Sequence, residues 1–315
     1  MFPFTRKNQF PVKGRLVVIT GGSQGMGLEV AKVLARKGAN VVIVARGVEK
    51  LEKAMKEVEA EAVEGSGQKF KWCSGDLSVA GEVERVFAEV VEWGGVPDIV
   101  WTCAGAAHPG LFTEITSEIL ESQMRTNYFS AMHTAHSALR LMTSSPLPAG
   151  APQRHLVFTA SVLAFIPLAG YNPYTPAKAA LRALADGLRQ ECLLYGIDVH
   201  CCFPATIYTP GYEFEQSVKP SLTKKLEEGD SGQTPVEVAR VCVGKLEKGQ
   251  SNVTTSLVGE ALRATAWGGS RRGNVVVDTV WIWIVAVVWL IVGWDMERTV
   301  RRWGRENGYA GSKKD

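Results

Sequence analysis

A tyrosine and a lysine stand four residues apart in the stretch Tyr174-Thr-Pro-Ala-Lys178. Near the start of a helix, this spacing places the phenol and the ammonium on one face. A phenol can protonate an alkoxide, and a neighbouring ammonium favours the phenolate and so lowers the tyrosine pKa from its usual value of about 10. The pair alone is a weak signal, because such a match arises easily by chance.

Two upstream polar residues strengthen it. Ser161 closes an apolar run thirteen residues before Tyr174, where open α/β sheets bind ligands at the carboxyl ends of their strands. Asn127 lies within an otherwise apolar helical stretch. The set fits reduction of a carbonyl group, with Ser161 holding the carbonyl oxygen and Tyr174 donating the proton. Lys178 would bond a nicotinamide ribose and tune Tyr174, and Asn127 would position a water that links Lys178 to solvent.

A glycine-rich turn follows the first apolar run and opens into a helix. Glycines let the backbone approach a pyrophosphate closely, and the helix N-terminus offers free N–H groups and partial positive charge to the anion. Such a turn alone also serves packing, but its place at the first strand-to-helix junction favours a dinucleotide site. The residues expected to contact the cofactor are Gly21, Ser23, Gln24, Gly25 and Gly27.

Arg46 ends the second apolar run, where enzymes that use NAD usually carry a carboxylate for the ribose 2′-hydroxyl. A cation there suits the 2′-phosphate of NADPH, although Arg46 could also be a solvated loop residue. Asp76 follows the third run and is placed to bond the adenine amino group, or alternatively to cap a helix.

Short runs rich in Val and Ile alternate with longer amphipathic stretches, which predicts an α/β domain with a doubly wound parallel (Rossmann) sheet. The predicted strands are 16–20, 40–45, 69–73, 98–102, 155–161 and 198–203. The predicted helices are Glu29–Lys37, Glu49–Ala62, Val83–Trp93, Ile119–Met142, Ala177–Tyr195 and Pro235–Lys248.

Composition narrows the class of protein. Hydrophobic residues make up 46% of the 315 residues and charged residues 21%, which excludes a disordered or fibrous chain. A net charge of +3 gives no reason to expect nucleic acid as a partner. The six cysteines show neither metal-ligand spacing nor a disulfide framework, so a reducing compartment is expected. The first fifteen residues lack the apolar core of a signal peptide, so we expect a cytosolic domain.

The segment 275–294 differs sharply, with Asp278 as its single charge. Twenty helical residues cover about 30 Å, the thickness of a bilayer core, which predicts membrane association. A buried core helix or an oligomer contact is the alternative. Arginines at 271 and 272 precede the segment, while Arg298 and others follow it. The positive-inside tendency would keep the residues after the segment in the cytosol, whereas a single span would place them across the membrane from a cytosolic domain. Two alternatives therefore stay open: a single span, or a re-entrant or interfacial segment.

Together these motifs resemble the short-chain dehydrogenase/reductase family over about residues 14–256. The resemblance adds Ala104, Gly105 and Thr209 to the expected cofactor contacts. Two departures are Thr102-Cys103 in place of an Asn-Asn pair, which removes a side-chain amide that stabilises the fourth strand, and Pro204-Ala205 in place of Pro-Gly. We expect a single catalytic domain over residues 1–256 and a membrane-associating tail over 257–315.

Within that family the chain is most similar to fungal 3-ketodihydrosphingosine reductases, on the stretches Tyr174–Leu181, Pro204–Tyr212 and Thr254–Leu257 and the apolar tail. The resemblance implies NADPH-dependent reduction of a long-chain keto base at the endoplasmic reticulum membrane, facing the cytosol. A membrane reductase of a steroid, a retinoid or a 3-ketoacyl-CoA is the alternative enzyme, and an NADPH-sensing scaffold the alternative without catalysis. Formation of a homo-oligomer stays open.

The family builds a substrate lid after Thr209. Apolar residues at spacing four (Phe214, Val218, Leu222 and Leu226) predict an amphipathic lid or a surface helix, with Pro220 interrupting the row. Glu213 or Glu215 is a candidate partner for a substrate ammonium. An exposed pair contributes at most about 1 kcal/mol, so activity is expected to depend steeply on chain length and only mildly on the amine.

Overall fold

The computed structural model describes residues 8–266 and 273–307, and a sheet of seven parallel strands forms its centre. The strand order is β3-β2-β1-β4-β5-β6-β7, so the order reverses between β1 and β4. All six predicted strands occur within two residues of their expected bounds, and β7 adds an edge strand. The strands are β1 Leu16–Thr20, β2 Asn40–Ala45, β3 Phe70–Ser74, β4 Ile99–Thr102, β5 Arg154–Thr159, β6 Ile197–Phe203 and β7 Asn252–Thr254.

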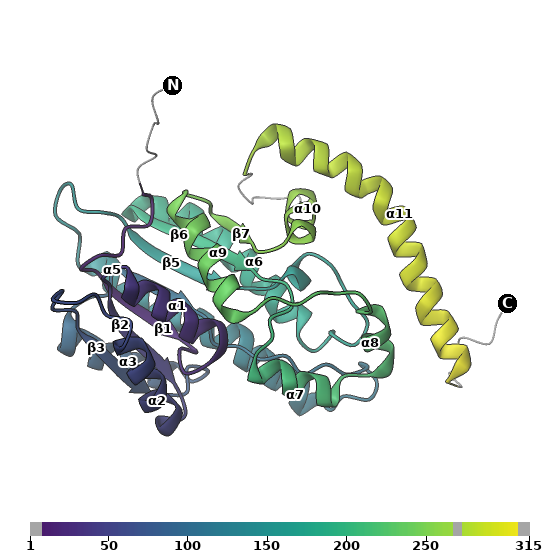
Figure 1. The fold of residues 1–315 in the computed structure, drawn as a ribbon, viewed down its shortest axis with the longest axis horizontal. Coiled ribbons are helices and arrows are strands. Elements are labelled where there is room, and N and C mark those ends of the chain that lie inside the picture. Colours follow the sequence, from purple (N-terminus) through teal and green to yellow (C-terminus); the bar gives the residue numbers. More distant parts are fainter. Residues whose placement is uncertain (1–7, 267–272, 308–315) are drawn as a thin grey trace.

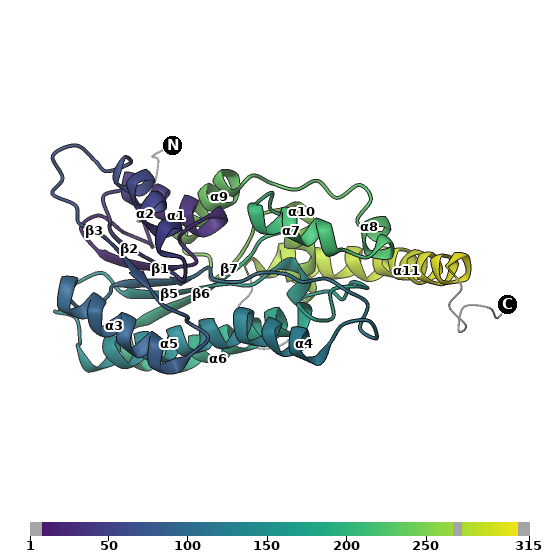
Figure 2. The same ribbon diagram turned by 90° about the horizontal axis from the view of Figure 1, so that it is seen from below.

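Helices cover both faces of the sheet, as the continuous apolar strands require. Figure 2 shows α1, α2 and α9 on one face and α3, α5 and α6 on the other. Each layer encloses its own apolar core, one around Ile19 and Trp101 and the other around Val18 and Phe158. The helices of these layers are α1 Gly25–Arg36, α2 Val48–Glu59, α3 Ala80–Gly94, α5 Ser130–Ser144, α6 Thr175–Glu191 and α9 Pro235–Glu247.

Two predicted helices are interrupted. The helix expected over Ile119–Met142 is divided into α4 (Ser117–Met124) and α5 by a π-helical segment, Arg125–Phe129. The helix expected to reach Tyr195 ends at Glu191, and a 3₁₀ turn follows until Gly196, which adopts a left-handed conformation at φ 63°. The predicted lid is also two helices, α7 (Pro210–Val218) and α8 (Ser221–Leu226), separated at Pro220 as expected.

The C-terminal part consists of α10 (Leu257–Thr265) and α11 (Val275–Glu306), a helix longer than the apolar segment that predicts it. Arg263 of α10 binds the buried carboxylate of Asp278 at 2.7 Å and so ties α11 to α10. Figure 1 shows α11 passing alongside the domain from α10 towards α8. Residues 271 and 272 lie outside the described residues. The division at residue 256 stays a prediction.

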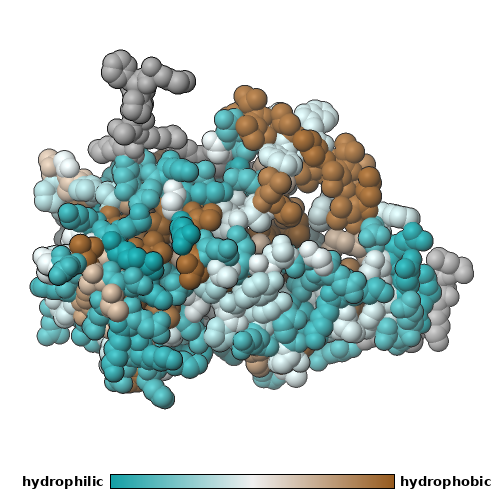
Figure 3. All heavy atoms as spheres, in the orientation of Figure 1, coloured by the Kyte–Doolittle hydropathy of each residue, from teal (hydrophilic) through white to brown (hydrophobic). Residues whose placement is uncertain are grey.

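The apolar surface of α11 is largely uncovered. Its most apolar stretch has a mean hydropathy of 2.5 and is only 6% buried, so the alternative of a buried core helix is wrong. Figure 3 shows apolar side chains gathered along this helix, above a mostly hydrophilic domain. By length and composition α11 can cross a membrane, and the arrangement suits membrane association.

Candidate active site

A cleft of about 1110 Å³ lies at the carboxyl ends of the strands. Strand-to-helix loops form its floor, and α7, α8, α10 and α11 contribute to its walls. This is the edge where open parallel sheets bind ligands. Of the predicted site residues, every one except Asn127 lines the cleft.

The glycine-rich turn forms one end of the cleft and packs too tightly to accept side chains at some positions. A Cβ atom at Gly27 would lie 2.4 Å from the carbonyl oxygen of Gly21, and one at Gly21 would lie 2.8 Å from Ala104 Cα. The N-cap residue of α1, Gln24, makes no side-chain capping hydrogen bond. The first N–H groups of α1 are therefore not capped by that side chain, which fits the binding of a phosphate group.

Arg46 and Asp76 both line this end of the cleft. Arg46 is exposed. Burial disfavours the charged form of Asp76, but hydrogen bonds from the backbone and side chain of Ser78 outweigh it and, with the charge of Arg46, lower the Asp76 pKa. Because Val79 is the N-cap residue of α3, the alternative role of Asp76 as that cap is wrong.

The end of β4 is held although the usual asparagine pair is absent. The hydroxyl of Thr20 accepts hydrogen bonds from the backbone N–H groups of Cys103 at 3.1 Å and Ala104 at 3.2 Å. Thr20 thus fixes the backbone that leads to Ala104 and Gly105 on the cleft wall. Thr209 lies opposite the glycine turn, where a Cβ atom at Gly25 would come within 3.1 Å of its methyl group.

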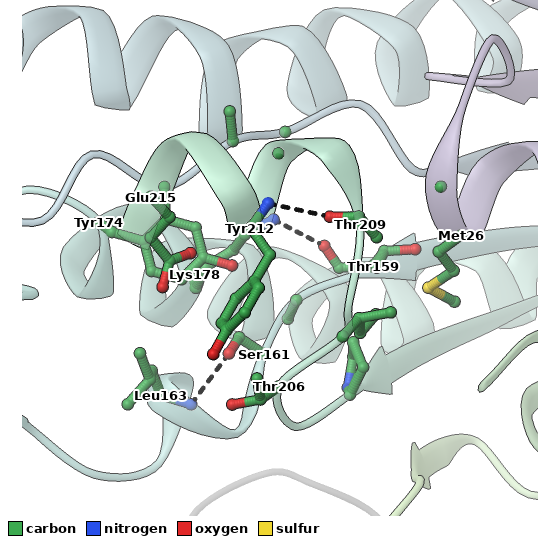
Figure 4. A pocket seen from close by; sticks show the side chains of 18 of the residues that line it. Met26, Thr159, Ser161, Leu163, Tyr174, Lys178, Thr206, Thr209, Tyr212 and Glu215 are labelled. Atoms are coloured by element: carbon green, nitrogen blue, oxygen red, sulfur yellow. Dashed lines mark hydrogen bonds between the residues drawn. The ribbon is translucent and has the colours of Figure 1, made fainter. Parts of the chain in front are cut away.

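Ser161 and Tyr174 line the other end of the cleft, and Figure 4 shows them on either side of the Tyr212 ring. Ser161 lies two residues beyond β5, and its hydroxyl accepts a hydrogen bond from Leu163 N at 3.2 Å. Its side chain also lies close enough to the phenol of Tyr174 to lower the pKa of that group. Tyr174 itself precedes α6 as its N-cap residue, so its ring projects from the start of the helix.

The pKa of Tyr174 is raised, where the sequence predicts that an ammonium lowers it. Burial raises the Tyr174 pKa, the negative charge of Glu215 raises it further, and the nearby Ser161 side chain offsets only part of this rise. Lys178 does not hydrogen-bond to the phenol. Its Nζ atom donates to the carbonyl oxygen of Thr159 at 3.0 Å, and burial lowers its own pKa to about 8.

Asn127 is fully buried in the π-helical segment. Its side-chain Nδ2 donates to the carbonyl oxygens of Ala106 at 2.8 Å and Gln123 at 3.0 Å, and its Oδ1 accepts from Ala106 N at 3.1 Å. A Cβ atom at Gly105 would lie 2.7 Å from Asn127 Oδ1 and 3.1 Å from Lys178 Nζ. The amide thus holds the loop after β4 close to Lys178, while the predicted water relay stays a prediction.

The structure brings further residues to the cleft that the motifs do not include. Tyr171, Glu215 and Glu227 line it near Tyr174, and Trp289, Val292 and Met296 of α11 line its apolar side. Of the expected lid row, Leu226 lines the cleft, whereas Phe214 is 53% exposed and packs on His108. Tyr171 lies only three residues before Tyr174, so its nearness in the sequence could have suggested a place in the site. The contacts of α11 with the cleft join residues far apart in the chain, and no local pattern predicts them.

Comparison with known proteins agrees with this geometry. The short chain dehydrogenase family matches residues 15–218. An L-sorbose reductase from Gluconobacter frateurii, solved with NADPH and L-sorbose, is similar in fold, with a TM-score of 0.63 and 24% identity over 75% of this chain and 90% of that one. A short-chain dehydrogenase/reductase from Mycobacterium ulcerans has a TM-score of 0.66 and 23% identity over 78% of this chain and 89% of that one.

Relatives named as 3-ketodihydrosphingosine reductases are more similar in sequence. The 3-ketodihydrosphingosine reductase of Aspergillus fumigatus is 45% identical over 98% of this chain and 89% of its own length. The reductase of Neurospora crassa is 41% identical over 97% of this chain and 87% of its own length. That of Cryptococcus neoformans is 37% identical over 91% of this chain and 84% of its own length. The chain therefore belongs to the short-chain dehydrogenase family, within the group of 3-ketodihydrosphingosine reductases.

Proposed function

We propose that this chain reduces the 3-keto group of 3-ketodihydrosphingosine to dihydrosphingosine with NADPH, as a step of sphingolipid biosynthesis. One observation carries the proposal: Ser161, Tyr174 and Lys178 converge at one end of a cleft whose other end is the glycine-rich turn. Relatives named for this reaction, up to 45% identical, support the choice of substrate.

The residues at the turn fit NADPH. Gly21, Ser23, Gln24, Gly25 and Gly27 would hold its pyrophosphate against the start of α1. Further along the cleft, Arg46 would bind the 2′-phosphate, Asp76 the adenine, and Ala104, Gly105 and Thr209 would border the remainder. When bound, NADPH supplies the hydride that reduces the carbonyl carbon.

The chain's own residues manage the oxygen of the ketone. Ser161 donates a hydrogen bond to the carbonyl oxygen, and Tyr174 gives that oxygen its proton as negative charge develops. Because burial raises the Tyr174 pKa, the phenol stays protonated until negative charge develops on the substrate oxygen and accepts the proton. Lys178 would bind the ribose hydroxyls and return a proton towards Tyr174, and Asn127 would position the loop and a water on that path.

The cleft suits a long apolar chain. Leu226, Leu257 and Val258 line it beside Trp289 and Val292 of α11. The carbons of a sphingoid base would lie along this wall, each buried methylene contributing about 0.8 kcal/mol. The membrane helix would then form part of the substrate site itself.

We further propose that α11 lies in the membrane surface and does not cross the bilayer. A spanning helix is surrounded by lipid over about 30 Å. One face of α11 instead packs on α10 and α8 and lines the cleft, while its other face is apolar and exposed. This arrangement supports an interfacial helix, with the cleft opening beside the lipid that holds the substrate.

The proposed location is the endoplasmic reticulum membrane, with the domain in the cytosol. All six cysteines are free thiols, which is typical of a reducing compartment. A glycosylation acceptor fused to the C-terminus tests the topology. We expect it to stay unmodified in microsomes, whereas modification would indicate a span.

The substrate is tested with the purified full chain in detergent micelles, following the absorbance of NADPH. A series of 3-keto sphingoid bases of decreasing length is compared with a steroid ketone, a retinoid and a 3-ketoacyl-CoA. We expect the longest base to react fastest and each shortening to lower kcat/KM. Faster turnover of a competitor would overturn the substrate assignment, and NADPH binding without turnover of any ketone would favour the sensing scaffold.

A further inference from the structure

Two carboxylates share one buried ammonium beside the active site. Lys219 Nζ lies 2.9 Å from Glu215 Oε1 and 2.6 Å from Glu227 Oε2, and its side chain is 1% exposed. Burial lowers the Lys219 pKa, but the hydrogen bonds to Glu227 and Glu215 outweigh this and raise it, so the ammonium stays charged. Two carboxylates against one ammonium give the group a formal excess of one negative charge.

That excess charge faces the cleft. Glu215 and Glu227 line the cleft, whereas the buried Lys219 is not among the residues that line it. The hydroxyl of Tyr171 donates to Glu215 Oε1, and the Nζ atom of Lys219 lies 5.4 Å from the ring centres of Tyr171 and Tyr212. These contacts hold Glu215 in place with only 15% of its side chain exposed. A preorganised, partly dehydrated carboxylate attracts a cation more strongly than an exposed one does.

The position also matches the proposed substrate. In 3-ketodihydrosphingosine the amine is on the carbon next to the ketone, so its ammonium must lie close to the group that protonates the ketone oxygen. Figure 4 shows Glu215 of α7 beside Tyr174. The two side chains are near enough for the charge of Glu215 to act on the Tyr174 phenol. Glu213, on the same helix, is exposed and does not line the cleft.

We propose that Glu215, held by Lys219 and Tyr171 and supported by the charge of Glu227, is an ammonium-binding subsite that selects 2-amino ketones. The inference rests on the proposed function and deepens it. It reverses the expectation that the amine matters only mildly, because that expectation assumed an exposed ion pair.

Binding of the ammonium would also assist the proton transfer. The charge of Glu215 disfavours a phenolate at Tyr174, and a substrate cation beside Glu215 cancels that charge. The amine should therefore raise kcat as well as lower KM. A des-amino ketone of equal length would meet an uncompensated negative charge at the same place.

The test compares 3-ketodihydrosphingosine with its des-amino analogue, 1-hydroxyoctadecan-3-one, on the full chain in detergent micelles with saturating NADPH. Wild-type protein should prefer the amino ketone in kcat/KM by about tenfold to a hundredfold, as expected for a hydrogen-bonded charge. Glu215→Gln should reduce this preference by at least about tenfold, whereas Glu213→Gln, a matched change on the exposed face, should leave it as in wild type.

The outcomes separate the two proposals. Equal use of both ketones by the wild type, or an unchanged preference in Glu215→Gln, would overturn the subsite and leave the reductase function standing. Turnover of neither ketone by the wild type would overturn the proposed function. Thermal unfolding shows whether Glu215→Gln folds. If it does not, the comparison of the two ketones on the wild-type protein still tests the subsite, because that comparison needs no variant.

Discussion

The ammonium of Lys178 donates a hydrogen bond to the carbonyl oxygen of Thr159 at 3.0 Å, while it lies 5.5 Å from the centre of the Tyr174 ring. The end of β5 thus anchors Lys178 beside the phenol without pairing the two groups. Burial lowers the pKa of this ammonium to about 8, and no carboxylate of residues 8–266 or 273–307 forms an ion pair with it.

Lys178→Met should therefore stabilise the fold and abolish turnover. The shift from the usual pKa of 10.5 to about 8 corresponds to about 3 kcal/mol of unfavourable burial at pH 7, part of which the lost hydrogen bond to Thr159 offsets. Because the Lys178 pKa is lower in the folded protein than in the unfolded one, the free energy of unfolding of the wild type rises between about pH 8 and 10.5. The stability difference between Lys178→Met and the wild type therefore becomes smaller over this range. Urea unfolding without cofactor measures this. Lys53→Met, at an exposed position, is the control. A Lys178→Met protein that is less stable than the wild type would contradict the prediction.

Tyr174→Phe should keep the affinity for NADPH and lower kcat by about a hundredfold or more, because only the proton donor is removed. Fluorescence titration of NADPH and steady-state turnover measure the two effects. Tyr195→Phe, at a 57% exposed position outside the cleft, should match the wild type. Turnover of Tyr174→Phe within a few-fold of wild type would show that another group donates the proton.

Arg46→Asp should shift cofactor preference towards NADH. The change removes a charge-assisted bond to the 2′-phosphate and adds repulsion, so the ratio of kcat/KM for NADPH to that for NADH should fall by about tenfold or more. Lys53→Asp makes the same charge change outside the cleft and should leave the ratio unchanged. An unaltered ratio in Arg46→Asp would mean that Arg46 is a solvated loop residue.

Asp278→Asn should loosen α11. Its carboxylate is 1% exposed and pairs with Arg263, which also pairs with Glu260. Without the Asp278 charge Arg263 keeps Glu260, but the ion pair that joins α11 to α10 is lost and the start of the helix should detach more easily. Hydrogen exchange in detergent should become faster at the first turns of α11. Glu297→Gln breaks an exposed pair with Arg301 on the same helix and should have little effect. Unchanged exchange in Asp278→Asn would show that other contacts hold α11.

Local patterns predict much of the fold and of the reacting end of the cleft. Six strands follow from short Val- and Ile-rich runs, and the glycine turn and the Tyr174–Lys178 pair are each contained within a few residues. Parallel strands bring their carboxyl ends to one edge, so the order of motifs along the chain predicts that they meet. The π-helical segment around Asn127 is not predicted, since it differs from an α-helix in hydrogen-bond register and not in residue pattern.

The amino-acid sequence by itself determined the α/β sheet, the glycine-rich turn, the candidate catalytic residues and the apolar tail, because each depends on neighbours within about a helical turn or a strand. Only the tertiary structure decided between Glu213 and Glu215. Residues two apart lie on opposite sides of a helix, and which side faces the cleft depends on how α7 packs against Tyr171 and the distant Glu227. It also decided that α11 forms a wall of the cleft, because contacts between residues far apart in the chain follow from packing and leave no local pattern.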